Sequence, residues 1–156
     1  ILLRHDHWGT RQVLAACEPL SEAQFHQRFS MGPGSLHDTI VHIIGAMRAW
    51  TDVLHQRDLR PRPEQGPKQT VAQLSTLLDQ TAAELSQVVR AHPLDQTVTR
   101  TREGKTYTFT RGMVATHVTT HAMHHRAQCL NMLRQLGVDP LPKSSVTEWS
   151  LSGDSA

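Results

Sequence analysis

The sequence has few cysteines, no long apolar run and no visible secretory signal, and each absence narrows the class of protein. No apolar stretch approaches the roughly 20 residues of a membrane-spanning helix, so we expect no membrane partner. The two cysteines, Cys17 and Cys129, fall in helical patterns, and no spacing indicates a disulfide or a zinc-binding CxxC pair. We therefore expect reduced, packed thiols and a cytoplasmic location.

A strong charge of either sign is also absent. The formal net charge of +2 is too small to indicate a nucleic-acid partner, and proline interrupts the densest basic stretch, residues 57–62. Two metal-site motifs are missing as well, the Glu-x-x-His pair of di-iron bundles and the H-E-x-x-H run of metalloproteases. These absences disfavour nucleic-acid binding, di-iron chemistry and zinc proteolysis.

Histidine, by contrast, is abundant: the chain has 11 histidines against 14 carboxylates. His121 and His125 are four residues apart in a helical pattern, which separates them by about 40° of rotation and roughly 6 Å of rise. Both imidazoles can therefore reach one point. Neutral imidazole is the commonest protein ligand for zinc, nickel, iron and copper, so this pair predicts half of a divalent-metal site.

Apolar periodicity and capping residues predict one compact domain of four long helices. Proline and glycine mark residues 57–68 as a crossover loop, and β-branched residues around Glu103-Gly104 predict a hairpin over 97–110. The expected fold is an all-α four-helix bundle with a long crossover and a short β-hairpin before the last helix. We expect the bundle to span residues 1–140 and a loosely docked tail to span 141–156. The expected long helices cover about residues 2–17, 36–56, 71–92 and 111–136.

His42 is the best candidate for a third ligand. It lies mid-way along the second expected helix, where Gly45, Ala46 and Ala49 leave space on the same face. Three neutral histidines with open coordination positions are typical of a catalytic metal centre, whereas a structural zinc site usually contains cysteine. Asp38 and Gln128 are candidates to hydrogen-bond the outer ring nitrogens of the ligands.

The remaining histidines carry weaker signals. His117 lies one turn before His121 and could be a fourth ligand or a lid, but a supporting or packing role is favoured. His124 points about 100° away from His125 and should not share the site. Solvated positions near element ends, in turns or on polar faces are expected for His5, His7, His26, His37, His55 and His92.

A longer pattern surrounds these ligands. The run H-x-x-x-H-R-x-Q at 121–128 follows an Asp-His-Trp at 6–8 and a Gly-Ser-Leu helix start at 34–36. Together with His42 and Trp50, this order of motifs resembles the DinB/YfiT-like metalloprotein family from Leu2 to Gly137. One departure is Ala127, where members usually have glycine; its methyl group could alter helix packing or a dimer contact.

The resemblance implies an up-down-down-up four-helix bundle, often dimeric, with one metal ligand from the second helix and two from the fourth. Carried onto this sequence, those ligands are His42, His121 and His125. The implied cofactor is a divalent metal ion, nickel or zinc first, with iron or manganese as alternatives. Relatives include enzymes that use low-molecular-weight thiols, among them S-transferases and a maleylpyruvate isomerase.

Three functions follow from these observations. The first is a metal-dependent enzyme, of thiol S-transferase or hydrolase type, that activates a small thiol or water as a nucleophile. The second is a non-catalytic stress-response protein that binds metal or a small ligand. The third is a structural role, in which the metal only stabilises the packing of the helices. Arg126 could bind an acidic substrate group, but an ion pair with Asp6 is favoured. Apolar surface at Trp50, Trp149 and the hairpin predicts a homodimer.

Overall fold

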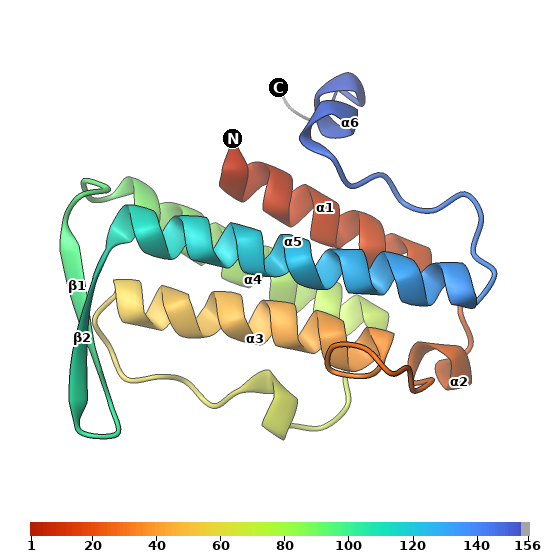
Figure 1. The fold of residues 1–156 in the computed structure, drawn as a ribbon, viewed down its shortest axis with the longest axis horizontal. Coiled ribbons are helices and arrows are strands. Elements are labelled where there is room, and N and C mark those ends of the chain that lie inside the picture. Colours follow the sequence, from red (N-terminus) through yellow and green to blue (C-terminus); the bar gives the residue numbers. More distant parts are fainter. Residues whose placement is uncertain (154–156) are drawn as a thin grey trace.

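The computed structural model describes residues 1–153 and consists mainly of helices with one β-hairpin (Figure 1), as predicted. Each of the helices α1 and α3 packs against both α4 and α5, so these long helices enclose a common core. The expected boundaries agree with the structure to within two residues. The long helices are α1 (Leu2–Cys17), α3 (Leu36–Leu54), α4 (Val71–Arg90) and α5 (Arg111–Gln135).

Side-chain caps begin the helices where the sequence predicts them. The Ser35 hydroxyl accepts a hydrogen bond from the backbone of Asp38 at the start of α3, and Thr70 forms a capping box at the start of α4. A second capping box, at Ser21, begins the short helix α2 (Glu22–Phe25). These caps satisfy backbone N–H groups that have no partner within a helix, and so they set where each helix starts.

The core is apolar along the length of the four helices, with one buried ion pair. The guanidinium of Arg126 donates to the carboxylate and the backbone carbonyl of Asp6, and both side chains are almost fully buried. The favoured prediction for Arg126 is therefore confirmed. Fully buried apolar side chains include Leu14, Leu36, Ile40, Ile43, Ile44, Met47, Leu54, Leu74, Leu78, Leu85 and Met132.

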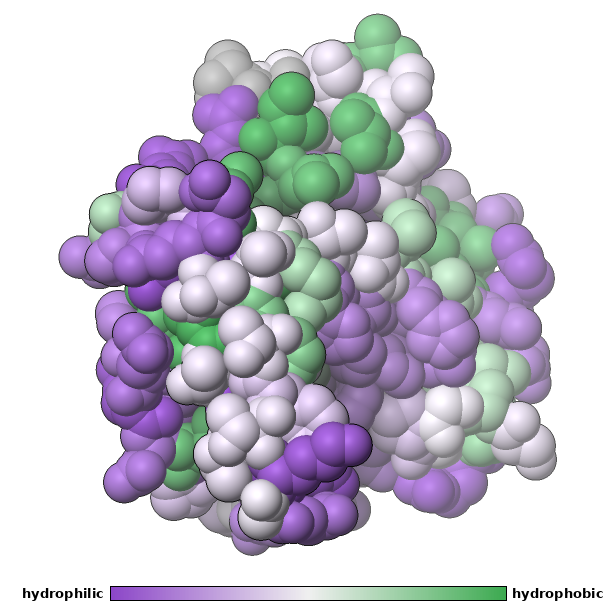
Figure 2. Space-filling model, turned by 60° about the vertical axis from the view of Figure 1, so that its left-hand side comes forward, coloured by the Kyte–Doolittle hydropathy of each residue, from purple (hydrophilic) through white to green (hydrophobic). Residues whose placement is uncertain are grey.

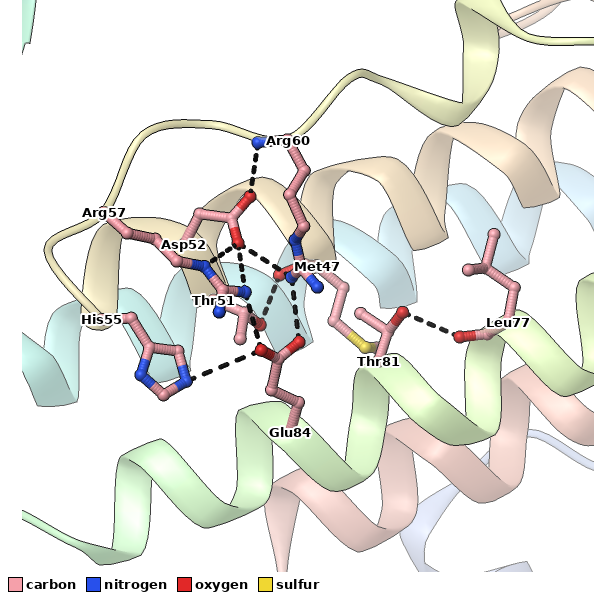
Figure 3. Close-up of polar contacts among 9 residues, drawn as sticks. All are labelled: Met47, Thr51, Asp52, His55, Arg57, Arg60, Leu77, Thr81 and Glu84. Carbon is pink, nitrogen blue, oxygen red and sulfur yellow. Dashed lines mark hydrogen bonds and ion pairs between the residues drawn. The ribbon is translucent and has the colours of Figure 1, made fainter.

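The crossover between α3 and α4 is held by a buried carboxylate near the end of α3 (Figure 3). Asp52 accepts hydrogen bonds from the Arg57 side chain and from the backbone N–H of Arg60, 3.0 Å away. Glu84 of α4 pairs with the same two arginines. The crossover then runs back along α3 as the 3₁₀ turn η1 (Pro63–Gln65) and packs on it. Its path is thus set by ion pairs rather than by regular structure.

The hairpin extends beyond the end of the helices (Figure 1). Its strands β1 (Thr97–Arg102) and β2 (Lys105–Thr110) are antiparallel, with Val98 opposite Phe109. Glu103 and Gly104 form the turn with φ of +53° and +74°, the left-handed conformation that a tight hairpin turn requires. Buried Val98 anchors the hairpin, and the Phe109 ring meets Trp50 of α3 edge-on.

The C-terminal segment packs more closely than predicted. Trp149, in the short helix α6 (Val146–Leu151), is buried beside His5 of α1, so its expected contribution to exposed surface is wrong. Residues 154–156 of the expected tail lie outside the described part. Figure 2 shows apolar atoms near the top of the molecule, where α6 and the start of α1 lie, and Ile1, Leu2 and Leu151 are exposed there. None of the helices in residues 1–153 is long and apolar enough to span a membrane.

Candidate metal centre

The structure brings together the three histidines that the sequence singles out. His42 of α3 faces His121 and His125 of α5 although 79 residues separate it from the nearer one. The Nε2 atoms of His42 and His121 are 3.2 Å apart. The His125 ring lies 4.7 Å from that of His42 and 4.5 Å from that of His121, measured between centroids. One ring nitrogen from each histidine lies within 4.8 Å of the others.

These distances fit a divalent metal ion. Two Zn–N bonds of about 2.0–2.1 Å at a tetrahedral angle place their nitrogens about 3.3–3.4 Å apart. The observed separation of 3.2 Å between the Nε2 atoms of His42 and His121 is close to that value. A cluster of neutral nitrogens is also the donor set that zinc, nickel and other late divalent ions prefer. The three side chains could therefore hold such an ion.

Polar side chains face the Nδ1 atoms of two of the rings, which leaves Nε2 of each ring for a metal ion. The Nδ1 atom of His125 lies 2.8 Å from Oε1 of Gln128, one of the two predicted partners. The Nδ1 atom of His42 lies 3.5 Å from Oε1 of Glu64, which comes from the crossover. A neutral ring that carries its proton on Nδ1 presents the Nε2 lone pair to a metal, so both partners favour the ligating tautomer.

Glu64 occupies the space that the small residues of α3 leave open. A Cβ atom added to Gly45 would lie 2.5 Å from Oε2 of Glu64 and 2.7 Å from its Oε1. Only glycine at this position lets the carboxylate approach the helix so closely. Glu64 is absent from the sequence prediction because no period places a residue of a proline-rich loop. The glycine within an otherwise apolar helix was the available signal, since it often marks a close approach.

The prediction that Asp38 supports a ligand is wrong. Its carboxylate pairs instead with Arg28, at 2.7 Å, and with Nδ1 of His37, at 2.9 Å. His37 is 5% exposed and also accepts a hydrogen bond from the backbone of Gln69. His5 is similarly buried and bonds to the backbone carbonyl of Ser144. The expectation of solvated rings at His5 and His37 is thus wrong, because loops distant in sequence cover both.

The surroundings of His121 and His125 favour the neutral form of both rings. Burial, followed by the neighbouring His125 and His42, lowers the pKa of His121 to about 4. Burial also lowers the pKa of His125, and the hydrogen bond to Gln128 opposes this shift only in part. At pH 7 the lone pairs of both rings are therefore free to bind a cation. The side chain of His42 is 34% exposed, so the cluster is open to solvent on one side.

The other histidines of α5 lie beside the cluster and outside the ligand set. His117 is exposed, and its ring packs between Trp50, at 5.2 Å, and His121, at 5.6 Å. His124 is also exposed, and its Nε2 contacts the Gln128 amide at 3.1 Å. Arg126 has no access to a substrate here because Asp6 and the core enclose it.

A mainly helical protein with three histidines clustered between two helices is the class that this fold and site define. The chain belongs to the DinB family, whose family model matches residues 1–150. Its fold is similar to that of a crystal structure of a DinB-like protein, YjoA, from Bacillus subtilis. That similarity has a TM-score of 0.70 at 17% sequence identity and covers 92% of this chain and 96% of the other. No curated protein matches the sequence.

Proposed function

We propose that this protein binds a divalent metal ion through His42, His121 and His125 and uses it as an enzyme, with a small thiol or water as the nucleophile. The observation that supports this most directly is the convergence of three ring nitrogens within 4.8 Å on a side of the molecule that solvent can reach. A purely structural site would more often be closed and rich in cysteine. Both cysteines of this chain are instead buried in the core.

Each residue of the site has a defined task in this proposal. The three imidazoles bind the ion, and Glu64 and Gln128 hold two of the rings in the ligating tautomer. A bound divalent ion would lower the pKa of a coordinated water or thiol toward neutrality, or polarise a substrate carbonyl. The ring of His117 packs beside His121, and the indole of Trp50 packs on His117, so both rings limit how a substrate can approach.

We extend the proposal to the assembly and the ion. The pairing of α1 and α3 with both α4 and α5 supports an up-down-down-up four-helix bundle. The all-imidazole donor set supports nickel or zinc. Exposed Ile1, Leu2 and Leu151 support a homodimer, which light scattering at several protein concentrations would test. A species of monomer mass at every concentration would contradict the dimer.

Elemental analysis of untagged protein is the first experiment. After supplementation with zinc and nickel, we expect close to one ion per chain in the unmodified protein. His42→Ala and His125→Ala should lose most of this metal, whereas His92→Ala, an exposed control, should keep it. Background metal in the unmodified protein would contradict the proposal.

Turnover is then measured with thiol cofactors and electrophiles, and should disappear in His121→Ala. Full metal occupancy without turnover would favour a non-catalytic binding protein instead.

A further inference from the structure

A second feature lies between the hairpin and the N-terminal half of α5, next to the histidine cluster. It is a cavity of about 630 Å³, within the range of small-molecule sites. Neither the metal ligands nor their supporting residues line it. The lining residues come from α3, both strands of the hairpin and α5, and are Trp50, Arg100, Arg102, Glu103, Tyr107, Phe109, Met113 and His117.

One wall of the cavity is aromatic. The Trp50 ring meets Phe109 edge-on at 5.4 Å, and Tyr107 stacks nearly parallel to Phe109 at 6.4 Å between centroids. Tyr107 and Met113 are 40% and 41% exposed, so a bound molecule can reach both side chains. In a sequence with only 4% aromatic residues, three of them meet at this one place. Such a wall suits a flat apolar group.

The same cavity carries positive charge. The Arg100 guanidinium lies over the Trp50 ring, 5.7 Å from its centroid. Arg102 is paired with Glu103 at 3.1 Å, but none of the carboxylates in residues 1–153 forms an ion pair with Arg100. A guanidinium that stacks on an indole still presents its N–H groups at its edge, where they can bind a carboxylate in a bidentate manner.

A row of rings connects this cavity to the candidate metal centre. Trp50 contacts His117 at 5.2 Å, and His117 contacts His121 at 5.6 Å, measured between ring centroids. A molecule bound against Trp50 therefore lies near the arginines on one side and near His117, which contacts His121, on the other. This arrangement separates a site for recognition from a site for chemistry.

We infer that the cavity binds the substrate of this site, a flat apolar molecule that bears a carboxylate. The ring system packs on Trp50 and Phe109, Arg100 binds the carboxylate, and the remaining end of the molecule lies toward His121. The inference rests on the proposed function only for the statement that the bound molecule is a substrate, because recognition itself requires no metal.

The test uses two probes of equal shape, 2-naphthoate and its neutral amide, 2-naphthamide. Each is titrated into ¹⁵N-labelled protein, with and without zinc, while the three indole N–H signals are followed. The Trp50→Phe variant assigns the Trp50 signal. We expect a saturable shift of that signal with naphthoate and no comparable shift for Trp8 or Trp149.

Arginine variants then separate charge recognition from stacking. Arg100→Gln should weaken naphthoate binding about fivefold to tenfold, as expected for one charged hydrogen bond at a partly exposed site, and leave naphthamide binding unchanged. Arg134→Gln, at the far end of α5, is the matched control and should bind both probes like the unmodified protein. Circular dichroism verifies that each variant is folded.

Equal affinity for the two probes, or a silent Trp50 signal, would overturn the inference. Its failure is distinguishable from failure of the proposed function. If His121→Ala holds no metal but still binds naphthoate, the result would support the cavity as a binding site independently of the proposed function. If the protein instead binds zinc and turns over thiols while the Trp50 indole signal does not shift with naphthoate, the proposed function stands and this inference is refuted.

Discussion

Glu64 and Gly45 make a sharp test of the metal centre, because the structure predicts that two unrelated substitutions have the same effect. Glu64→Gln removes the negative charge that faces Nδ1 of His42 at 3.5 Å and keeps the size of the side chain. Gly45→Ala leaves Glu64 in the sequence but places a methyl group about 2.5 Å from its carboxylate oxygen, so the carboxylate must move away.

The expected magnitude follows from the role of such partners. Loss of the group that orients a ligating histidine typically weakens metal binding about 10-fold to 100-fold, or roughly 1.4–2.7 kcal/mol. Within an ordinary helix, Gly→Ala would stabilise the protein by about 0.5–1 kcal/mol. We therefore expect Gly45→Ala to lose metal affinity without a matching loss in the stability of the metal-free protein.

Zinc affinity is measured at pH 7.5 by competition with a chromogenic chelator, and the stability of metal-free protein by urea unfolding. The exposed Glu18→Gln is the matched charge control and should bind zinc like the unmodified protein. Because both substitutions act through one carboxylate, the double variant should bind no more weakly than the worse single variant. Unchanged affinity in Glu64→Gln, or additive losses in the double variant, would refute this reasoning.

Three further predictions concern the core, the crossover and pH. Arg126→Met leaves the Asp6 carboxylate buried without its partner and should lower the free energy of unfolding, measured in urea, by about 3–5 kcal/mol. Adding Asp6→Leu to the same chain should restore most of this loss. A loss below about 1 kcal/mol in Arg126→Met would contradict the role of the buried pair. Asp52→Asn should release the crossover, speed its cleavage by trypsin and lower zinc affinity through Glu64, whereas cleavage at the unmodified rate would argue against this anchor. Finally, the folded pKa of His121, about 4, lies below the unfolded value near 6.5, so metal-free protein should lose stability as pH falls from 6.5 toward 4, when the unfolded chain binds the proton first. Because the ring is partly exposed, the effect should be small. Between pH 7.5 and 5, the fall in unfolding free energy should be only about 1 kcal/mol smaller in His121→Gln than in the unmodified protein, and equal falls would refute the pKa shift.

The carboxylates that hold the crossover also lose their contribution to stability as the pH falls, but in a lower pH range than His121. Burial alone would raise the pKa of Asp52, but hydrogen bonds from the backbone and side chain of Arg60 and from Arg57 outweigh it and lower that pKa. The stability that this cluster contributes is therefore present above the ordinary carboxyl pKa near 4 and is lost only as the pH falls through the lower folded value. At pH 5 the crossover should remain in place.

Local rules account for most of the helices and for half of the candidate metal site. Capping residues and apolar periodicity decide where α1, α3, α4 and α5 begin and end, since both act over a few neighbouring residues. The pair His121 and His125 follows from helical geometry alone, because residues four apart share a face in any α-helix. The volume left beside His42 by small residues similarly indicated that another group would fill it.

Only the tertiary structure decided what that group is and how the rings are oriented. Glu64 reaches His42 because ion pairs to Asp52 and Glu84 hold the crossover against α3, and no periodic pattern encodes the path of such a loop. Asp38, the nearer carboxylate in sequence, pairs with Arg28 instead. Sequence alone therefore determined which side chains can share a helical face, whereas contacts between distant segments determined their partners, because hydrogen bonds and charges depend on distances that only the packed chain sets.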